Sequence, residues 1–322
     1  MLVYLDCDPG IDDALAIGYL LAHPEVDLAL VGSVSGNTDA VTAAANARDL
    51  LGLLGRPEIP VAVGSTDFLT HPYGGGAPHV HGDNGIGGVE LPRSSSSFAA
   101  GTAAQELVQL AHARPGELHV LAIGPLTNLA LALQLDPGLP ELVADVVIMG
   151  GAALAPGNVT AAAEANIHND PEAAAAVFAA NWDVTIVPLD ATMLQRFEQG
   201  DLDALLAGGP RAAALGGMLG TYFGFYHVHF GRPSSALHDP LAAAVLTREA
   251  VVSRQARVPV AVDTGDGPGR GQTIADLRGQ YRLVEPQHPD GVRVVFDVAE
   301  PFAPQLLARL LALDSVPTGS KP

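Results

Sequence analysis

The sequence has few of the residues that form disulfides or basic surfaces. It contains a single cysteine, Cys7, so no disulfide can form within the chain. Basic residues number 16 against 35 acidic ones, which gives a formal net charge of −19. A surface this acidic repels phosphate groups, so neither nucleic acid nor an anionic membrane is expected as a partner. The single cysteine fits a reducing compartment, and we expect a cytoplasmic protein.

Long apolar runs are also scarce. Alanine-rich stretches are broken by charged residues, proline or glycine before they reach the length that spans a bilayer. A strand-like run follows Met1 directly, so we expect no signal peptide ahead of it. What remains is a chain of 322 residues, 48% of them hydrophobic, which is enough to build a substantial core.

Strand-like and helix-like segments alternate along the first two-thirds of the chain. We expect strands near residues 2–5, 27–34, 61–63, 118–123, 143–149 and 184–189. Helices are expected at residues 38–54, 126–135, 171–180, 202–228 and 301–313. The alternation predicts an α/β fold with an open, mainly parallel sheet and helices on both faces. A small antiparallel extension is expected from residues 258–262, 281–284 and 292–298.

One long segment interrupts this rhythm. Residues 64–97 are rich in glycine, proline, histidine and serine and show little periodicity, as in functional loops. Elsewhere no linker-like segment or internal repeat divides the chain. We therefore expect a single domain at residues 1–314 and a disordered tail at residues 315–322.

Four aspartates crowd the turn between the first strand and the first helix: Asp6, Asp8, Asp12 and Asp13. Carboxylates this close raise one another's pKa values and destabilise a partly dry site. A hard divalent cation relieves the repulsion, because Ca²⁺ and Mg²⁺ both prefer oxygen ligands. Capping of the helix explains one or two of these residues but not Asp6 and Asp8 on either side of Cys7. The turn therefore predicts a metal site.

Carboxylates, amides and a histidine recur after the other expected strands. Ligands of open parallel sheets bind beyond the carboxyl ends of the strands, so residues at these positions are candidates for the site. The convergence of polar side chains on one edge of the sheet predicts a binding site there. The candidates are Asn37, Asn158, Glu164, Asn166, Asp170, His238 and Asp239.

In order along the chain, these motifs resemble those of the inosine-uridine-type nucleoside hydrolases. The sequence D-C-D-P-G-I-D-D-A at residues 6–14 is similar to the family's opening signature, and H-G-D-N-G at residues 81–85 to its loop histidine motif. The resemblance implies Ca²⁺-dependent hydrolysis of the N-glycosidic bond of ribonucleosides, in nucleoside catabolism and salvage. It also implies a homotetramer or homodimer. Further matches lie at residues 123–128, 148–151, 158, 164–167, 170–173 and 238–240, so the resemblance covers residues 2 to about 313.

The resemblance also implies the residues that hold the ion and the attacking water. Asp8, Asp13 and Asp239 are expected to bind Ca²⁺ through their carboxylates, and Ile123 through its backbone carbonyl. Asp8 is further expected to orient and deprotonate the attacking water.

Ribose binding is assigned in the same way. Asp12, Asn166 and Asp239 are expected to bind the 2′- and 3′-hydroxyls, with Asn37 in support. Asn158 and Glu164 are expected to hold the 5′-hydroxyl. Met149 is expected to line the sugar pocket.

The chemistry of the reaction agrees with these roles and adds a base-side donor. Cleavage builds positive charge on the ribose, which a carboxylate-rich pocket stabilises. The base departs as an anion unless it is protonated, so a nearby donor helps. His238 is the leading candidate for this catalytic donor and His81 the second. Purine-selective relatives stack tryptophans on the base, whereas Trp182 is expected in the core, so an inosine-uridine or pyrimidine preference is favoured.

Two other functions stay open at this point. The pair Asp6 and Asp8 also resembles the paired aspartates of Mg²⁺-dependent haloacid-dehalogenase-like phosphohydrolases, although Gly10 stands where those enzymes have threonine or valine. A non-catalytic nucleoside-binding protein on the same fold is the second alternative. His227 and His229 are expected near the base or, equally, as exposed or core residues.

Overall fold

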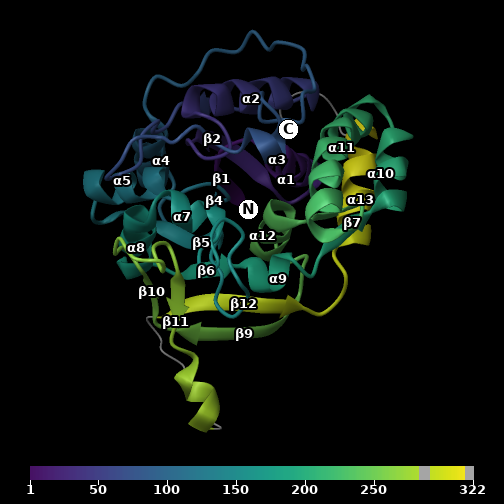
Figure 1. The fold of residues 1–322 in the computed structure, drawn as a ribbon. Coiled ribbons are helices and arrows are strands. Elements are labelled where there is room, and N and C mark those ends of the chain that lie inside the picture. Colours follow the sequence, from purple (N-terminus) through teal and green to yellow (C-terminus); the bar gives the residue numbers. More distant parts are fainter. Residues whose placement is uncertain (283–290, 316–322) are drawn as a thin grey trace.

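The computed structural model describes residues 1–282 and 291–315, and an eight-stranded sheet forms its centre (Figure 1). The strand order is β3-β2-β1-β4-β5-β6-β12-β9. Neighbouring strands are parallel except for β9, which is antiparallel to β12. The expected open, mainly parallel sheet is therefore confirmed. Its strands are β1 (Leu2–Cys7), β2 (Asp27–Ser33), β3 (Val61–Ala62), β4 (Leu118–Ala122), β5 (Val143–Met149), β6 (Val184–Val187), β9 (Val252–Val258) and β12 (Val292–Val298).

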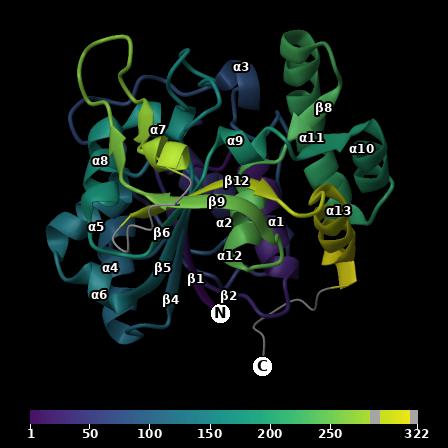
Figure 2. The ribbon, with the colours of Figure 1, turned by 90° about the horizontal axis from the view of Figure 1, so that it is seen from below.

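Helices cover both faces of the sheet, as expected (Figure 2). Successive side chains of a strand point to opposite faces. Val3 and Leu5 of β1 accordingly belong to one apolar core, and Leu2 and Tyr4 to the other. The first core is covered by α1 (Ile11–Ala22), α2 (Ala40–Leu53), α9 (Leu189–Thr192), α10 (Gln199–Leu206), α11 (Pro210–Phe230), α12 (His238–Leu246) and α13 (Ala303–Leu311). The second is covered by α4 (Ala103–Ala113), α5 (Thr127–Leu135), α6 (Leu139–Leu142), α7 (Ala165–Asn169) and α8 (Pro171–Ala179).

Several short elements complete the fold. The long segment at residues 64–97 contains the helix α3 (Pro78–His81), and the last described residues form the 3₁₀ helix η2 (Ala312–Ser315). Among the described residues, none of the helices combines the length and the apolar character needed to cross a bilayer. Antiparallel pairs outside the central sheet are β7 (Arg196–Glu198) with β8 (Ser234–Ala236), and β10 (Val260–Val262) with β11 (Thr273–Ala275).

The C-terminal third differs in detail from the expectation. The pair β10–β11 is the small antiparallel extension, but residues 292–298 form β12 of the central sheet, because they pair in parallel with β6. Within the expected strand at 281–284, residues 281–282 end the 3₁₀ helix η1 (Leu277–Arg282), and 283–284 lie outside the described residues. The expected single helix at 202–228 is two helices, α10 and α11, separated at Gly208 and Gly209. Of the expected tail, residues 316–322 also lie outside the described residues.

The strand order creates a switch point between β1 and β4. The chain builds β2 and β3 on one side of β1 and then crosses to β4 on the other side. Ligands of such sheets bind at this point, beyond the carboxyl ends of the strands. Asp8 follows β1 and Ile123 follows β4, and the N–H of Ile123 donates to the carbonyl of Asp6 at 2.8 Å. The topology therefore brings both segments of the expected metal site together.

Candidate active site

Four buried carboxylates meet at this edge of the sheet: Asp8, Asp12, Asp13 and Asp239, each at most 5% exposed. One carboxylate oxygen from each of Asp12, Asp13 and Asp239 lies within 4.8 Å of the others. Burial and the neighbouring charge of Asp13 raise the pKa of Asp12 to about 7, and burial raises the pKa of Asp13 to about 6. Burial and nearby aspartates also raise the pKa values of Asp8 and Asp239 well above their usual range. Ionised, this cluster requires a compensating positive charge.

Asp8 has an oxygen that suits a cation. Its Oδ2 accepts the backbone N–H of Asn37 at 2.6 Å, whereas its buried Oδ1 has no hydrogen-bond partner within the described parts of the chain. Two glycines leave room for this carboxylate, since a Cβ would lie 2.0 Å from Oδ2 at Gly36 and 2.7 Å from Oδ1 at Gly124. An unpartnered buried carboxylate oxygen among three other carboxylates fits a hard divalent cation.

Asp13 serves the helix as well as the cluster. Its Oδ2 accepts the N–H of Gly10 at 2.8 Å and the Nδ2–H of Asn37 at 3.3 Å, and its Oδ1 accepts the N–H of Asp8 at 3.2 Å. The capping interpretation is therefore correct for this aspartate. Capping does not exclude metal binding, because a carboxylate has about four lone-pair sites.

Asp6 lies apart from the cluster. It falls on the same side of β1 as Tyr4, whose hydroxyl donates to Oδ2, and the Nδ2–H of Asn128 donates to the same oxygen at 3.0 Å. The period-2 alternation of a strand points Asp6 toward the face covered by α4 and α5. Only three of the four aspartates in the turn therefore belong to the acidic site.

Asn166 joins the carboxyl ends of two strands. Its Nδ2–H donates to the backbone carbonyl of Ile123 at 2.9 Å and to that of Met149 at 3.1 Å. The Ile123 carbonyl keeps a second lone pair for another partner. The expected sugar residues Asn166 and Met149 thus lie beside an expected metal ligand.

Glu164 and Asn158 organise the segment that follows β5. The Glu164 carboxylate caps α7, accepting the N–H groups of Gly151 at 2.9 Å, Asn166 at 2.9 Å and Ile167 at 3.2 Å. Burial nevertheless raises the pKa of Glu164. Asn158 is exposed, and its Oδ1 accepts the N–H of Ala165 at 3.0 Å. Both residues therefore lie at one end of α7, next to Asn166.

His238 lies at the start of α12 beside Asp239. Its ring is clamped between two hydroxyls, with Nδ1 at 2.7 Å from Oγ1 of Thr192 and Nε2 at 2.8 Å from the hydroxyl of Tyr226. Burial, with a smaller effect of Arg196, lowers the pKa of His238 to about 4. In the ligand-free site this ring is neutral at neutral pH.

His81 comes from α3, in the long loop. Its Nδ1 accepts the N–H of Ile11 at 3.1 Å, so the proton of the neutral ring is on Nε2. Burial, followed by the nearby His238, lowers the pKa of His81 to about 3. The neutral His81 ring therefore carries its N–H at Nε2, from which it can donate a hydrogen bond.

An aromatic face of α11 contacts Asp12, His81 and His238, and it was not assigned to the site from the sequence. The hydroxyl of Tyr222 donates to Oδ2 of Asp12 at 3.2 Å, and its ring centroid lies 5.3 Å from that of His81. Phe225 contacts both Tyr222 and Tyr226. Spacings of three and four residues place these three rings on one helix face, a signal that the sequence contains. His227 and His229 of the same helix are exposed.

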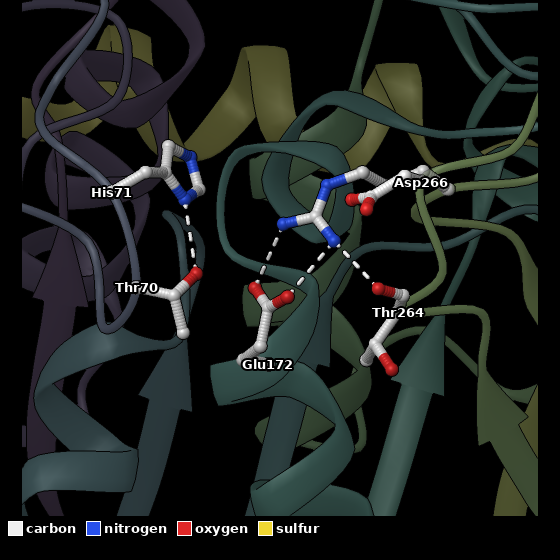
Figure 3. Close-up of a pocket in the computed structure, with 6 residues that line it drawn as sticks. Thr70, His71, Glu172, Thr264 and Asp266 are labelled. Carbon is white, nitrogen blue, oxygen red and sulfur yellow. Dashed lines mark hydrogen bonds and ion pairs between the residues drawn. The ribbon is translucent and has the colours of Figure 1, made fainter.

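A hollow of about 360 Å³ is lined by residues that do not belong to the carboxylate cluster (Figure 3). Arg270 crosses it and donates to both carboxylate oxygens of Glu172, at 2.8 and 3.0 Å, and to the carbonyl of Thr264 at 2.8 Å. Because Glu172 already balances the guanidinium charge, these contacts hold the loop after β10 against α8. The other lining residues are Thr70, His71 and Asp266.

Buried carboxylates at the switch point of a parallel sheet, flanked by two neutral histidines, are typical of a hydrolase that activates water. A family model described as inosine-uridine preferring nucleoside hydrolase matches residues 3–303. The chain belongs to this family. It is an N-glycosyl hydrolase that cleaves ribonucleosides.

Individual relatives share most of the chain. It is 37% identical over 281 residues to the probable uridine nucleosidase 2 of Oryza sativa subsp. japonica, covering 85% of this chain and 82% of that protein. It is 34% identical over 310 residues to the pyrimidine-specific ribonucleoside hydrolase RihA of Salmonella gallinarum, covering 96% and 97%. A solved purine-preferring ribonucleoside hydrolase from Gardnerella vaginalis superposes with a TM-score of 0.90 at 30% identity, covering 98% and 100%. Relatives of this fold thus differ in the base that their names specify.

Proposed function

We propose that this chain is a Ca²⁺-dependent ribonucleoside hydrolase with an inosine-uridine or pyrimidine preference over strict purine specificity. The observation that supports the metal is the unpartnered, buried Oδ1 of Asp8, whose charge interacts with those of Asp12, Asp13 and Asp239, three carboxylates that cluster closely enough to hold an ion. An all-oxygen donor set of this kind suits Ca²⁺. The proposed ligands are the carboxylates of Asp8, Asp13 and Asp239 and the backbone carbonyl of Ile123.

The preference for the base rests on two observations. The relatives with 34–37% identity described above are named for uridine or for pyrimidine nucleosides. The sole tryptophan, Trp182, donates its Nε1–H to the carbonyl of Val177 in α8, on the other face of the sheet from the aromatic rings of α11. We therefore do not propose that Trp182 stacks on the nucleobase.

The sugar side of the proposed mechanism depends on the carboxylates. A bound divalent cation supplies positive charge that lowers the pKa of a neighbouring water molecule. Asp8 accepts the proton of the attacking water as a general base. Asp12, Asn166 and Asp239 bind the 2′- and 3′-hydroxyls, with Asn37 holding Asp8 and Asp13. The negative charge around the ribose stabilises the positive charge that develops at C1′.

A further set of residues is proposed to bind the 5′ end of the ribose and to act on the base. Asn158 and Glu164 bind the 5′-hydroxyl, and Met149 lines the sugar pocket. His238 is the proposed proton donor to the departing base. Negative charge developing on that base favours the protonated ring and so raises the pKa of His238 from its ligand-free value of about 4. His81 assists with a hydrogen bond from Nε2.

Replacing His238 is expected to slow the enzyme in proportion to how poorly the base leaves. His238→Ala should lower kcat for uridine and inosine by about 10²- to 10⁴-fold, the usual contribution of a general acid. Hydrolysis of 4-nitrophenyl β-ribofuranoside, whose leaving group needs no proton, should change less than about threefold. Initial rates on the three substrates measure the difference. Equal losses on all three would contradict proton donation by His238.

The experiment that tests the proposed function compares substrates with and without a chelator. Uridine, cytidine, inosine and adenosine are each supplied to the enzyme in Ca²⁺ and after treatment with EGTA. We expect release of ribose from uridine, cytidine or inosine at more than about ten times the kcat/KM for adenosine, and loss of release in EGTA. A selective preference for adenosine, or full activity in EGTA, would refute the proposal.

A phosphohydrolase role is disfavoured by the position of Asp6. In that mechanism Asp6 attacks phosphorus, so it must point into the site together with Asp8. Its carboxylate instead accepts hydrogen bonds from Tyr4 and Asn128 on the other side of the strand. Phosphate release from 4-nitrophenyl phosphate, measured in the same preparations, is therefore expected to be absent.

The remaining proposals concern the whole molecule. We propose that residues 1–314 act as one catalytic domain, in keeping with the continuous central sheet. A cytoplasmic location and a homodimeric or homotetrameric assembly are proposed from the composition and from membership of the family.

A further inference from the structure

We propose that Asp190 is a positioning residue for the part of the ribose pocket that receives the 5′-hydroxyl. The inference rests on the proposed function, which assigns the 5′-hydroxyl to Asn158 and Glu164. Asp190 belongs to α9, a helix of four residues that directly follows β6 and Pro188. It contacts neither of the two proposed ligands, so its effect on substrate passes through the chain between them and β5.

Asp190 binds that chain through three backbone groups. Its carboxylate accepts the N–H of Ala153 at 2.9 Å, of Leu154 at 2.8 Å and of Ala155 at 3.1 Å. The N–H of Leu189, the preceding residue, donates to the carbonyl of Gly151 at 2.9 Å. Four hydrogen bonds therefore attach the first part of the segment after β5, between Gly151 and Ala155, to α9.

The attached segment packs through small side chains only: Ala152 is buried, and Ala153 and Ala155 lie against the apolar cores. Leu154 is 57% exposed and Val159 is 53% exposed, so neither side chain contributes a hydrophobic anchor. The segment ends at Ala163 and Glu164, which are buried, and Asn158 lies between the two ends. Hydrogen bonds to a carboxylate are stronger than those between neutral groups. Asp190 therefore adds directional hydrogen bonds at the start of a segment that no large apolar side chain anchors.

The same helix also reaches the base side of the site. Thr192, two residues after Asp190, is fully buried and lies 2.7 Å from Nδ1 of His238. Figure 1 shows α9 next to α12, where His238 begins the helix. Thr192 and Asp190 thus offer a matched pair of variants, because they share one short helix but contact protein groups at opposite ends of the proposed substrate site.

The test compares uridine with 5′-deoxyuridine, which lacks only the 5′-hydroxyl. In Asp190→Asn, kcat/KM for uridine should fall about tenfold, mainly through KM, while that for 5′-deoxyuridine should change less than about twofold. Asp190→Ala should give a larger selective loss, and the Asn variant, which keeps one acceptor oxygen, carries the test if the Ala variant does not fold. Thr192→Val should instead lower kcat/KM equally for uridine and 5′-deoxyuridine, and it should leave the hydrolysis of 4-nitrophenyl β-ribofuranoside unchanged.

Two further variants make the outcomes distinguishable. Asp136→Asn removes a carboxylate that accepts the N–H of Gly138 at 2.8 Å, at the far end of α5, and should leave the uridine to 5′-deoxyuridine ratio unchanged. Asn158→Ala should lower that ratio directly. If Asn158→Ala affects both substrates equally, the proposed 5′-hydroxyl site is wrong. If Asn158→Ala is selective but Asp190→Asn is not, the role of Asp190 is overturned.

Discussion

Replacing Asp8 with asparagine is expected to lower kcat for uridine by at least about 10³-fold. The substitution keeps the size of the side chain but removes the general base and one proposed metal ligand at once. It also leaves an amide where the buried Oδ1 is without a partner among the described residues. Stopped assays of ribose release, together with Ca²⁺ binding by calorimetry, measure both effects, and the affinity for Ca²⁺ should fall with the rate.

A buried aspartate outside the site provides the control. Asp49 in α2 is 5% exposed and accepts hydrogen bonds from Arg48 and from the N–H of Ser94. Asp49→Asn should lower the free energy of unfolding while leaving kcat within about twofold of the unchanged enzyme. If Asp8→Asn behaves like Asp49→Asn, losing stability but not kcat, Asp8 is not the general base.

Calcium is expected to stabilise the protein more at pH 8 than at pH 5. Burial, with the charge of Asp13, raises the pKa of Asp12 to about 7, and burial raises that of Asp13 to about 6, both above the value of about 3.9 in an unfolded chain. Between about pH 4 and 7 the ligand-free fold keeps protons that the unfolded chain releases, so its stability falls as the pH rises. A cation bound to the ionised carboxylates reverses this loss of stability. Its affinity rises with pH, because the carboxylates lose the protons that compete with it.

Thermal unfolding with EGTA or with Ca²⁺ at the two pH values measures this effect. A free Ca²⁺ concentration of about 100 times Kd stabilises a protein by about 2.7 kcal/mol. The rise in Tm caused by Ca²⁺ should therefore be clear at pH 8 and small at pH 5. In Asp13→Asn the difference between the two pH values should shrink. An equal rise in Tm at both pH values would mean that these carboxylates do not titrate against the ion.

Local sequence patterns predicted the frame of the molecule well. β5 was predicted at its observed bounds, Val143–Met149, because its second half, residues 146–149, is a continuous buried apolar run of the kind found in a strand that is covered on both faces. The turn after β1 was predicted as a crowded acidic site for a similar reason, since its aspartates are adjacent in sequence. Features that depend on residues close together in the chain can be predicted from the sequence.

Features that depend on packing between distant segments could not be predicted from the sequence. Asp6 was grouped with the acidic site, but the alternation of β1 points it to Tyr4 and Asn128. Residues 292–298 were expected in the small extension, but β12 pairs with β6, more than 100 residues earlier in the chain. Strand partners of this kind depend on the assembled sheet, and a single strand does not specify them.

The supporting residues of the site were missed for the same reason. Thr192 and Tyr226 bind the two nitrogens of His238 from α9 and α11, which are far apart in sequence. Each looks like an ordinary buried residue until the helices are in place. The residues that contact substrate in our proposal, and Asn37 that supports them, came from the sequence, whereas Thr192 and Tyr226, which orient His238, came only from the structure.

The measurement that tests the central claim most directly is reconstitution of the chelated enzyme with Ca²⁺. Calorimetry counts the ions bound per chain while parallel assays follow the hydrolysis of uridine. We predict one tightly bound ion per chain, with activity rising in proportion to its occupancy from a chelated state with almost none. Full turnover of uridine by enzyme that binds no Ca²⁺ would contradict the account.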